Sequence, residues 1–230
     1  MKKFGLCLVL GLSAFCLLTA ASPVKAYADT VNLYFEGAGP NVTPDGKYYA
    51  YPYYSFSVDG GPGNTPLMCV SFTNEIYMYE HWTATIEPIS AMAALEPISG
   101  IITAAPLPDT TDWEEAAWLY NDANVYASDH ARVDEDQLAA WSLFVPAGEV
   151  AGSDNGQLTL AQQFVAANPN DPIFYSKVQA YVPLDGWPSG NDVPQILLGY
   201  APAPEPGSLL LLGSGLLAFA GVLYRKRRTA

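Results

Sequence analysis

The chain has 230 residues, of which 50% are hydrophobic and 14% are charged, and its formal net charge is −13. Between residues 29 and 206 all 23 acidic residues meet only three basic ones, Lys47, Arg132 and Lys177, so this body carries a net charge of −20. Such a body repels nucleic acid and anionic membrane surfaces, which excludes nucleic-acid binding. Its many aromatic and branched apolar residues predict a folded rather than a disordered chain.

The first 28 residues have the layout of a secretory signal peptide. Lys2 and Lys3 precede an apolar run that extends to about residue 21, and the small side chains of Ala26 and Ala28 form a cleavage site. The alternative is an uncleaved membrane anchor, but the run is short and ends in a cleavable site. Export would remove the first two cysteines and leave Cys69 as the one cysteine of the mature chain.

The body, residues 29–200, begins with patterns typical of strands. Alternating apolar residues predict strands at 31–37 and 82–87, and an apolar run predicts another at 67–73. The aromatic stretch 46–64 predicts one or two strands that close in a Gly/Pro turn at 59–62. Residues 88–110 contain four prolines and predict a loop with a short helix near 91–95.

Three helix patterns follow. "DTTDWEEAAWLYND" predicts a helix capped by Thr111 or Asp112, and "VDEDQLAAWSLFVP" predicts a second with acids in its first turn that stops before Pro146. "LTLAQQFVAANPND" predicts a third, after which "PIFYSKVQAYVPL" and "VPQILLGYAP" return to strand patterns. This order predicts an α+β fold with an antiparallel β-sandwich or barrel-like core and a helical insertion.

Three features follow one another at the C-terminus. Residues 201–207 form a short extended linker that contains Pro204, Glu205 and Pro206, and residues 208–224 are apolar and just long enough to cross a thin bilayer. The tail at 225–230 is basic and should stay on the cytoplasmic side. Its cluster consists of Arg225, Lys226, Arg227 and Arg228.

This arrangement resembles the PEP-CTERM sorting signal of Gram-negative bacteria that make extracellular polysaccharide. The resemblance implies an exported protein that an exosortase-type membrane protease cuts near the Pro-Glu-Pro triplet. It also implies a location in the cell envelope, on the outer surface or in the extracellular matrix, with a transient or permanent single-pass membrane anchor. The apolar segment alone fits a plain membrane anchor equally well.

The body offers little for metal or enzyme chemistry. His81, His130 and Cys69 cannot fill a usual zinc shell without carboxylates, and the acids at 129–136 lack the spacing of an EF-hand loop. No G-x-S-x-G elbow occurs in the body, and Cys69 lies in a strand pattern rather than at a helix N-terminus that would favour a thiolate. We therefore expect no metal, no cofactor and no enzyme.

A single cysteine in an exported chain has three interpretations. It is buried as a small apolar side chain, it pairs with a second molecule, or it reacts with a side chain of its own domain. The segments "LMCV" and "EDQLAAW" resemble the cysteine and glutamine motifs of bacterial thioester domains, and "WEEAAWLYNDANVY" resembles the helix between them. Met68 replaces an aromatic that is common in that family, and Asp136 replaces a frequent threonine.

The resemblance implies an internal thioester between Cys69 and Gln137, formed with loss of ammonia. A thioester needs a dry pocket, which Trp118, Trp141 and the aromatic cluster at 48–54 could line. The alternative for Gln137 is a polar residue on a helix surface, which is usual for glutamine. If the thioester forms, the sulfur of Cys69 and the side-chain carbon of Gln137 must lie at contact distance.

These features together predict an adhesin-like protein that attaches covalently to amines on an extracellular surface or polysaccharide matrix. The main alternative is a noncovalent structural or carbohydrate-binding β-sandwich of the matrix, which would expose an aromatic patch. A third is a hydrolase that acts on the matrix.

Overall fold

The computed structural model describes residues 30–38, 54–61, 63–72, 76–95, 108–184 and 194–200. The predicted signal peptide with its cleavage site lies outside these residues, as do the linker, the apolar segment and the basic tail from residue 201 onward. In the part of the chain that is described, no helix is both long enough and apolar enough to span a bilayer.

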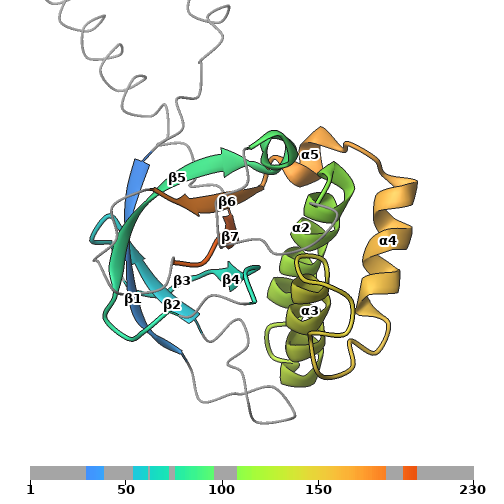
Figure 1. Cartoon of the computed structure of the whole chain (residues 1–230), viewed down its shortest axis with the longest axis horizontal. Coiled ribbons are helices and arrows are strands. Elements are labelled where there is room, and N and C mark those ends of the chain that lie inside the picture. Colours follow the sequence, from blue (N-terminus) through green and yellow to red (C-terminus); the bar gives the residue numbers. More distant parts are fainter. Residues whose placement is uncertain are drawn as a thin grey trace, which may run out of the picture.

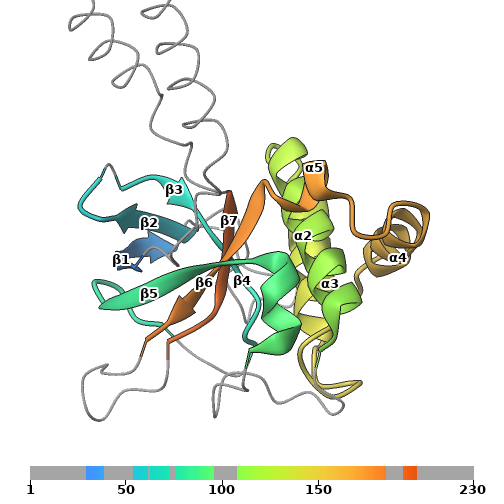
Figure 2. The same ribbon diagram turned by 90° about the horizontal axis from the view of Figure 1, so that it is seen from above.

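One antiparallel sheet of seven strands organises the described residues (Figures 1 and 2). The strands are β1 (Thr30–Ala38), β2 (Tyr54–Val58), β3 (Thr65–Pro66), β4 (Met68–Cys69), β5 (His81–Pro88), β6 (Val178–Pro183) and β7 (Leu197–Tyr200). Their order in the sheet is β3-β2-β1-β5-β6-β7-β4. Because only Leu67 separates β3 from β4, one continuous segment joins the two edges, and the sheet is a nearly closed barrel. The predicted α+β fold with a barrel-like antiparallel core is therefore confirmed.

Closure of the barrel depends on a glycine in β7. A Cβ atom at Gly199 would lie 2.5 Å from Cδ2 of Leu67 and 2.7 Å from a ring carbon of Tyr181. Both distances are shorter than any normal contact, so only glycine lets the β3–β4 segment pack against β7 at this point.

The turn after β2 forms where the sequence predicts it. Asp59 and Gly60 have φ angles of 51° and 71°, and the Gly61 amide donates to the Val58 carbonyl at 2.9 Å. Two consecutive positive φ values define a type I′ turn, for which an Asp-Gly pair is a preferred sequence.

The helices occupy the chain between β5 and β6, as the predicted insertion requires. They are the 3-10 helix η1 (Ile89–Ala94) and the α-helices α2 (Thr110–Val125), α3 (His130–Ser142), α4 (Gln157–Ala167) and α5 (Pro172–Tyr175). Figures 1 and 2 show α2 and α3 beside the strands, with α4 on the side of these two helices that faces away from the sheet. The architecture is thus a barrel-like sheet with a helical layer against one side.

Helices α2 and α3 begin at positions that differ from those predicted from the sequence. The cap of α2 is Asp109 rather than Thr111 or Asp112: its carboxylate accepts from the amides of both, and the Asp112 side chain accepts from the Asp109 amide in a capping box. Helix α3 begins at His130 with Asp129 as its cap, so its acidic residues lie beyond the first turn. In both cases the cap lies upstream of the predicted start, because an aspartate there satisfies amides that the helix cannot.

Two strand predictions also need correction. Of the strand predicted at 67–73, only Met68 and Cys69 pair, as β4, and β3 at Thr65–Pro66 lies before the predicted start. The stretch predicted as strand from Pro172 begins with α5, because Asp171 caps the turn and proline is favoured at the first helical position. The strand starts only at Val178.

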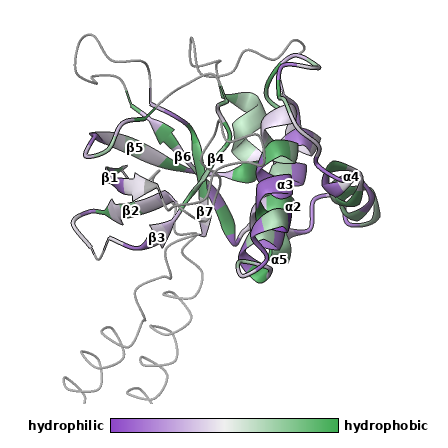
Figure 3. Ribbon diagram, turned by 90° about the horizontal axis from the view of Figure 1, so that it is seen from below, coloured by the Kyte–Doolittle hydropathy of each residue, from purple (hydrophilic) through white to green (hydrophobic). Residues whose placement is uncertain are grey.

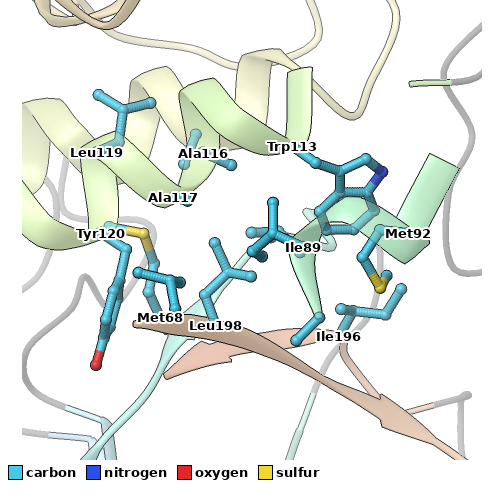
Figure 4. Close-up of a cluster of buried hydrophobic side chains, with 14 of the residues drawn as sticks. Met68, Ile89, Met92, Trp113, Ala116, Ala117, Leu119, Tyr120, Ile196 and Leu198 are labelled. Atoms are coloured by element: carbon cyan, nitrogen blue, oxygen red, sulfur yellow. The ribbon is translucent and has the colours of Figure 1, made fainter. Parts of the chain in front are cut away.

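Two apolar clusters fill the molecule. One lies inside the barrel, and the other lies between the sheet and the helical layer. Figure 4 shows the second cluster, in which Trp113 and Tyr120 of α2 lie on the side of the helix that faces the strands with Leu198. Purple segments along α3 in Figure 3 mark hydrophilic residues on this helix. Several of them are buried, which leads to the candidate site.

Candidate functional site

Cys69 lies on β4, at the edge where the barrel closes. Leu67 and Cys69 belong to the cluster inside the barrel, whereas Met68 and Val70 belong to the cluster under the helices. This alternation follows from the two-residue period of an extended chain. The Cys69 side chain is fully buried, and its thiol donates to the Ser71 carbonyl at 3.4 Å. A thiol so enclosed does not form a disulfide with the thiol of a second protein molecule while the domain is folded.

Burial controls the acidity of this thiol. Removal from water raises the pKa of Cys69 to about 12, although hydrogen bonds with the Trp141 side chain and the Ser71 backbone oppose part of the rise. The thiolate is therefore rare at neutral pH, which argues against a standing cysteine nucleophile of the protease type.

Gln137 comes to Cys69 from α3, 68 residues later in the chain. Its side-chain amide donates from Nε2 to the Cys69 backbone carbonyl at 2.6 Å. The residue has no exposed surface, so the alternative of a glutamine on the helix surface is wrong. The structure thus brings the two residues of the predicted pair together at the sheet edge.

The Gln137 amide is only half satisfied. Its Oε1 atom is buried and has no hydrogen-bond partner among the described residues. A purely structural glutamine would supply the donor that the β4 carbonyl needs. It would, however, leave the Oε1 acceptor buried without a hydrogen bond, which costs about 1–3 kcal/mol. Gln157 has such an orphaned carbonyl as well, so it is the position beside Cys69 that distinguishes Gln137.

Trp141 closes the site from the same helix. It follows Gln137 by four residues, so the two side chains lie on one face of α3. Its side chain lies beside the Cys69 sulfur and packs against Phe72, with ring centroids 5.2 Å apart. Tyr54, the described member of the predicted aromatic cluster, belongs to the same interior cluster as Cys69. Trp118, in contrast, packs against Phe164 of α4 in the other cluster, and its predicted role in drying the pocket is wrong.

A polar contact holds α3 against α2 next to the site. Arg132 donates from Nε and Nη2 to the two carboxylate oxygens of Asp122 at 2.6 and 3.0 Å, and its guanidinium lies 3.8 Å from the centre of the Tyr126 ring. The adjacent Asp136 is fully buried, and burial together with the charge of Asp122 raises the pKa of its carboxyl. This fork fixes the helix that carries Gln137.

Sequence reasoning found the two central residues but not their supports. Ser71, whose hydroxyl accepts from the Ile196 amide at 3.0 Å, and the Arg132–Asp122 fork were not anticipated. A signal for the fork existed, because Arg132 is one of only three basic residues in an acidic body. Nothing in the local sequence identifies Asp122 as its partner.

The two histidines that were considered as partners of Cys69 lie at the surface. His81 and His130 are exposed, whereas Cys69 is fully buried. Across the described ranges, no three His, Cys, Asp or Glu side chains are grouped so that they could hold a metal ion.

Comparison with known proteins identifies the C-terminal end of the chain. Residues 202–228 match the family model of the PEP-CTERM protein-sorting motif. The match includes the Pro204–Pro206 triplet and the basic cluster, and it implies an exported, envelope-associated protein that exosortase processes at the membrane. No curated protein and no solved structure matches the chain.

Proposed function

We propose that the exported domain forms an internal thioester between Cys69 and Gln137 and uses it to bind covalently to amines at the cell surface or in the extracellular matrix. The contact between the Gln137 amide and the Cys69 backbone carbonyl is the observation that carries this proposal. It supports a geometry in which the leaving nitrogen, the reacting carbonyl carbon and the sulfur belong to one buried group of atoms.

Formation of the bond is a balanced acyl transfer. The Cys69 sulfur attacks the Gln137 side-chain carbon, a C–S bond forms, and the C–N bond to Nε2 breaks. The departing nitrogen takes the thiol proton and leaves as ammonia, so the domain loses the mass of one ammonia and no oxidant is required. Holding both groups in one pocket replaces a bimolecular encounter by an intramolecular step.

The surroundings support a long-lived thioester. Water hydrolyses thioesters, and the site is enclosed by the barrel interior, by Trp141 and by Phe72. The raised pKa of the thiol also makes the sulfur a poor leaving group, since a leaving thiol departs faster when its pKa is low. A primary amine that enters the pocket would attack the Gln137 carbonyl, form an amide and restore the Cys69 thiol.

Intact mass of the exported protein tests the proposal directly. We expect the wild-type mass to fall below the sequence mass by one ammonia, and Cys69→Ala and Gln137→Ala each to restore the full mass. Treatment of the wild type with methylamine should return one thiol and add methylamine at residue 137.

Gln157→Ala is the matched control. Gln157 is also buried, and its Oε1 likewise has no hydrogen-bond partner among the described residues, but it lies on α4. This variant should keep the ammonia loss. A wild-type protein with full mass and a titratable thiol after unfolding would rule the thioester out.

A further inference from the structure

An exposed group of tyrosines lies on the outward side of the sheet at β1, opposite the barrel interior. Tyr34 of β1 is 39% exposed, and Tyr77, Met78 and Tyr79 in the turn before β5 are 53%, 55% and 64% exposed. The rings of Tyr34 and Tyr79 are paired, with centroids 6.3 Å apart. We call these four residues the tyrosine ledge. It is separate from the buried Cys69 site, which belongs to the barrel interior.

The backbone of the ledge is strained at Tyr79. Its φ angle is 70°, in the left-handed region that favours glycine at the third position of such a turn. Hydrogen bonds hold it there: the Tyr79 amide donates to the Phe35 carbonyl at 2.8 Å, and the Glu80 amide donates to the Tyr77 carbonyl at 3.0 Å. A bulky residue in this conformation costs about 1–3 kcal/mol. Since the Tyr79 ring is mostly exposed, its burial does not offset that cost.

Polar side chains border the ledge on the same face of the sheet. In the β1–β5 register Tyr34 pairs with His81 and Asn32 pairs with Thr83, so all four side chains lie on one face. The Thr83 hydroxyl donates to the Asn32 side chain at 3.4 Å, and Asn32 in turn donates to Asp59. Aromatic faces therefore lie next to an amide, a hydroxyl, an imidazole and a carboxylate.

We propose that the tyrosine ledge binds a segment of neutral polysaccharide. One face of a pyranose ring is lined by C–H groups, which carry slight positive charge and contact the negative face of an aromatic ring. The hydroxyls around the sugar rim can then bond to the polar groups that border the ledge.

The negative charge of the body favours a neutral polysaccharide over anionic ligands. None of the described residues of β1, of the turn at 76–80 or of β5 is a lysine or an arginine, and the body carries a net charge of −20. An acidic polysaccharide or an anionic lipid surface would be repelled. An apolar protein partner would meet only one aliphatic side chain on the ledge, Met78, among polar neighbours.

Isothermal titration of the exported protein tests this site, with cellohexaose, laminarihexaose and maltohexaose as neutral probes and a polygalacturonate oligomer as the acidic probe. We expect at least one neutral probe to bind and the acidic probe to bind more weakly. Tyr79→Gly and Tyr77→Ala should each weaken binding about tenfold, because each removes one aromatic face. Tyr79→Gly should also keep or raise the melting temperature, since glycine relieves the left-handed strain.

The controls separate this site from the thioester. Val125→Ala removes an exposed apolar side chain from the helical layer, and Cys69→Ala removes the thioester; both should bind sugar as the wild type does. The proposal is overturned if no neutral probe binds, if the acidic probe binds best, or if Tyr79→Gly and Tyr77→Ala both bind normally. Loss of sugar binding in Cys69→Ala would show that the ledge is not an independent site.

Discussion

The side-chain amide of Gln137 shows how one residue can be both well placed and poorly satisfied. Its Nε2 atom donates a hydrogen bond to the backbone carbonyl of Cys69, which at the β4 edge would otherwise be buried without a donor. Its Oε1 atom has no hydrogen-bond partner in the described residues. A glutamine whose only role is at the sheet edge gains one hydrogen bond and loses another. A glutamine that takes part in acyl transfer instead needs its side-chain carbonyl carbon accessible to the Cys69 sulfur.

The thiol itself can be examined in a variant that cannot form the thioester. In Gln137→Met, which keeps the volume of the side chain, Cys69 should alkylate at pH 8 at least about 10³-fold more slowly in the folded protein than in concentrated urea. The reason is the pKa of about 12, against about 8.5 for an unfolded cysteine, together with the absence of exposed surface. Iodoacetamide labelling followed by mass spectrometry measures both rates. Similar rates in the two states would mean that the thiol is open to solvent.

At the scale of elements, the site depends on how α3 is held between β4 and α2. The Arg132–Asp122 fork fixes one side of α3, and Leu138 and Trp141 pack into the barrel interior from the other. Close packing continues beyond the helix, because a Cβ atom at Gly152 would lie 2.9 Å from Cδ1 of Leu138. The helix therefore has little freedom to move Gln137 away from Cys69.

The N-terminal cap of the neighbouring helix α2 can be tested by mutation. Asp109→Ala should lower the free energy of unfolding by about 1 kcal/mol, because it leaves the amides of Thr111 and Asp112 without their acceptor. Urea denaturation monitored by circular dichroism measures the change. Thr111→Ala is the control, since Thr111 is exposed and is not the cap, and it should be close to neutral. A larger loss for Thr111→Ala than for Asp109→Ala would place the cap where the sequence pattern alone put it.

At the scale of the whole molecule, several carboxyl groups of this acidic body are buried in the helical layer. Burial, followed by the charge of Asp112, raises the pKa of Glu115 to about 7, and burial raises that of Asp134 to about 6. The pKa of Asp136 is also raised, by burial and by Asp122. An acid whose pKa is higher in the folded state holds its proton more tightly there than in the unfolded chain.

Stability should therefore fall as the pH rises. Between the unfolded pKa values near 4 and the folded values of about 6 and 7, unfolding releases protons, so each increase in pH favours the unfolded state. We expect a higher free energy of unfolding at pH 5 than at pH 8, measured by urea titration across this range. Glu115→Gln combined with Asp134→Asn should flatten the dependence, whereas Glu149→Gln, which changes an exposed carboxylate, should not. A flat wild-type profile would contradict the protonation of these buried acids.

The sequence by itself determined the features that are read along a continuous segment. The sorting motif is confirmed over residues 202–228 because a triplet, an apolar run and a basic cluster need no partner elsewhere in the chain. The helical insertion and the strands at β1 and β5 were predictable for the same reason, since periodicity is a local property. The two-residue ladder at Cys69 was not predictable, because the length of β4 depends on its pairing with β7, which comes much later in the chain.

Only the tertiary structure decided what surrounds each functional side chain. Gln137 looked equally suited to a helix surface, and its burial against Cys69 arises from the packing of α3 on the edge of β4, across 68 residues of chain. The tyrosine ledge likewise joins a strand to a turn more than forty residues away, through the register of β1 with β5. Such proximity depends on contacts distant in sequence, whose free energy comes from burying the whole core, and no short stretch of residues encodes it.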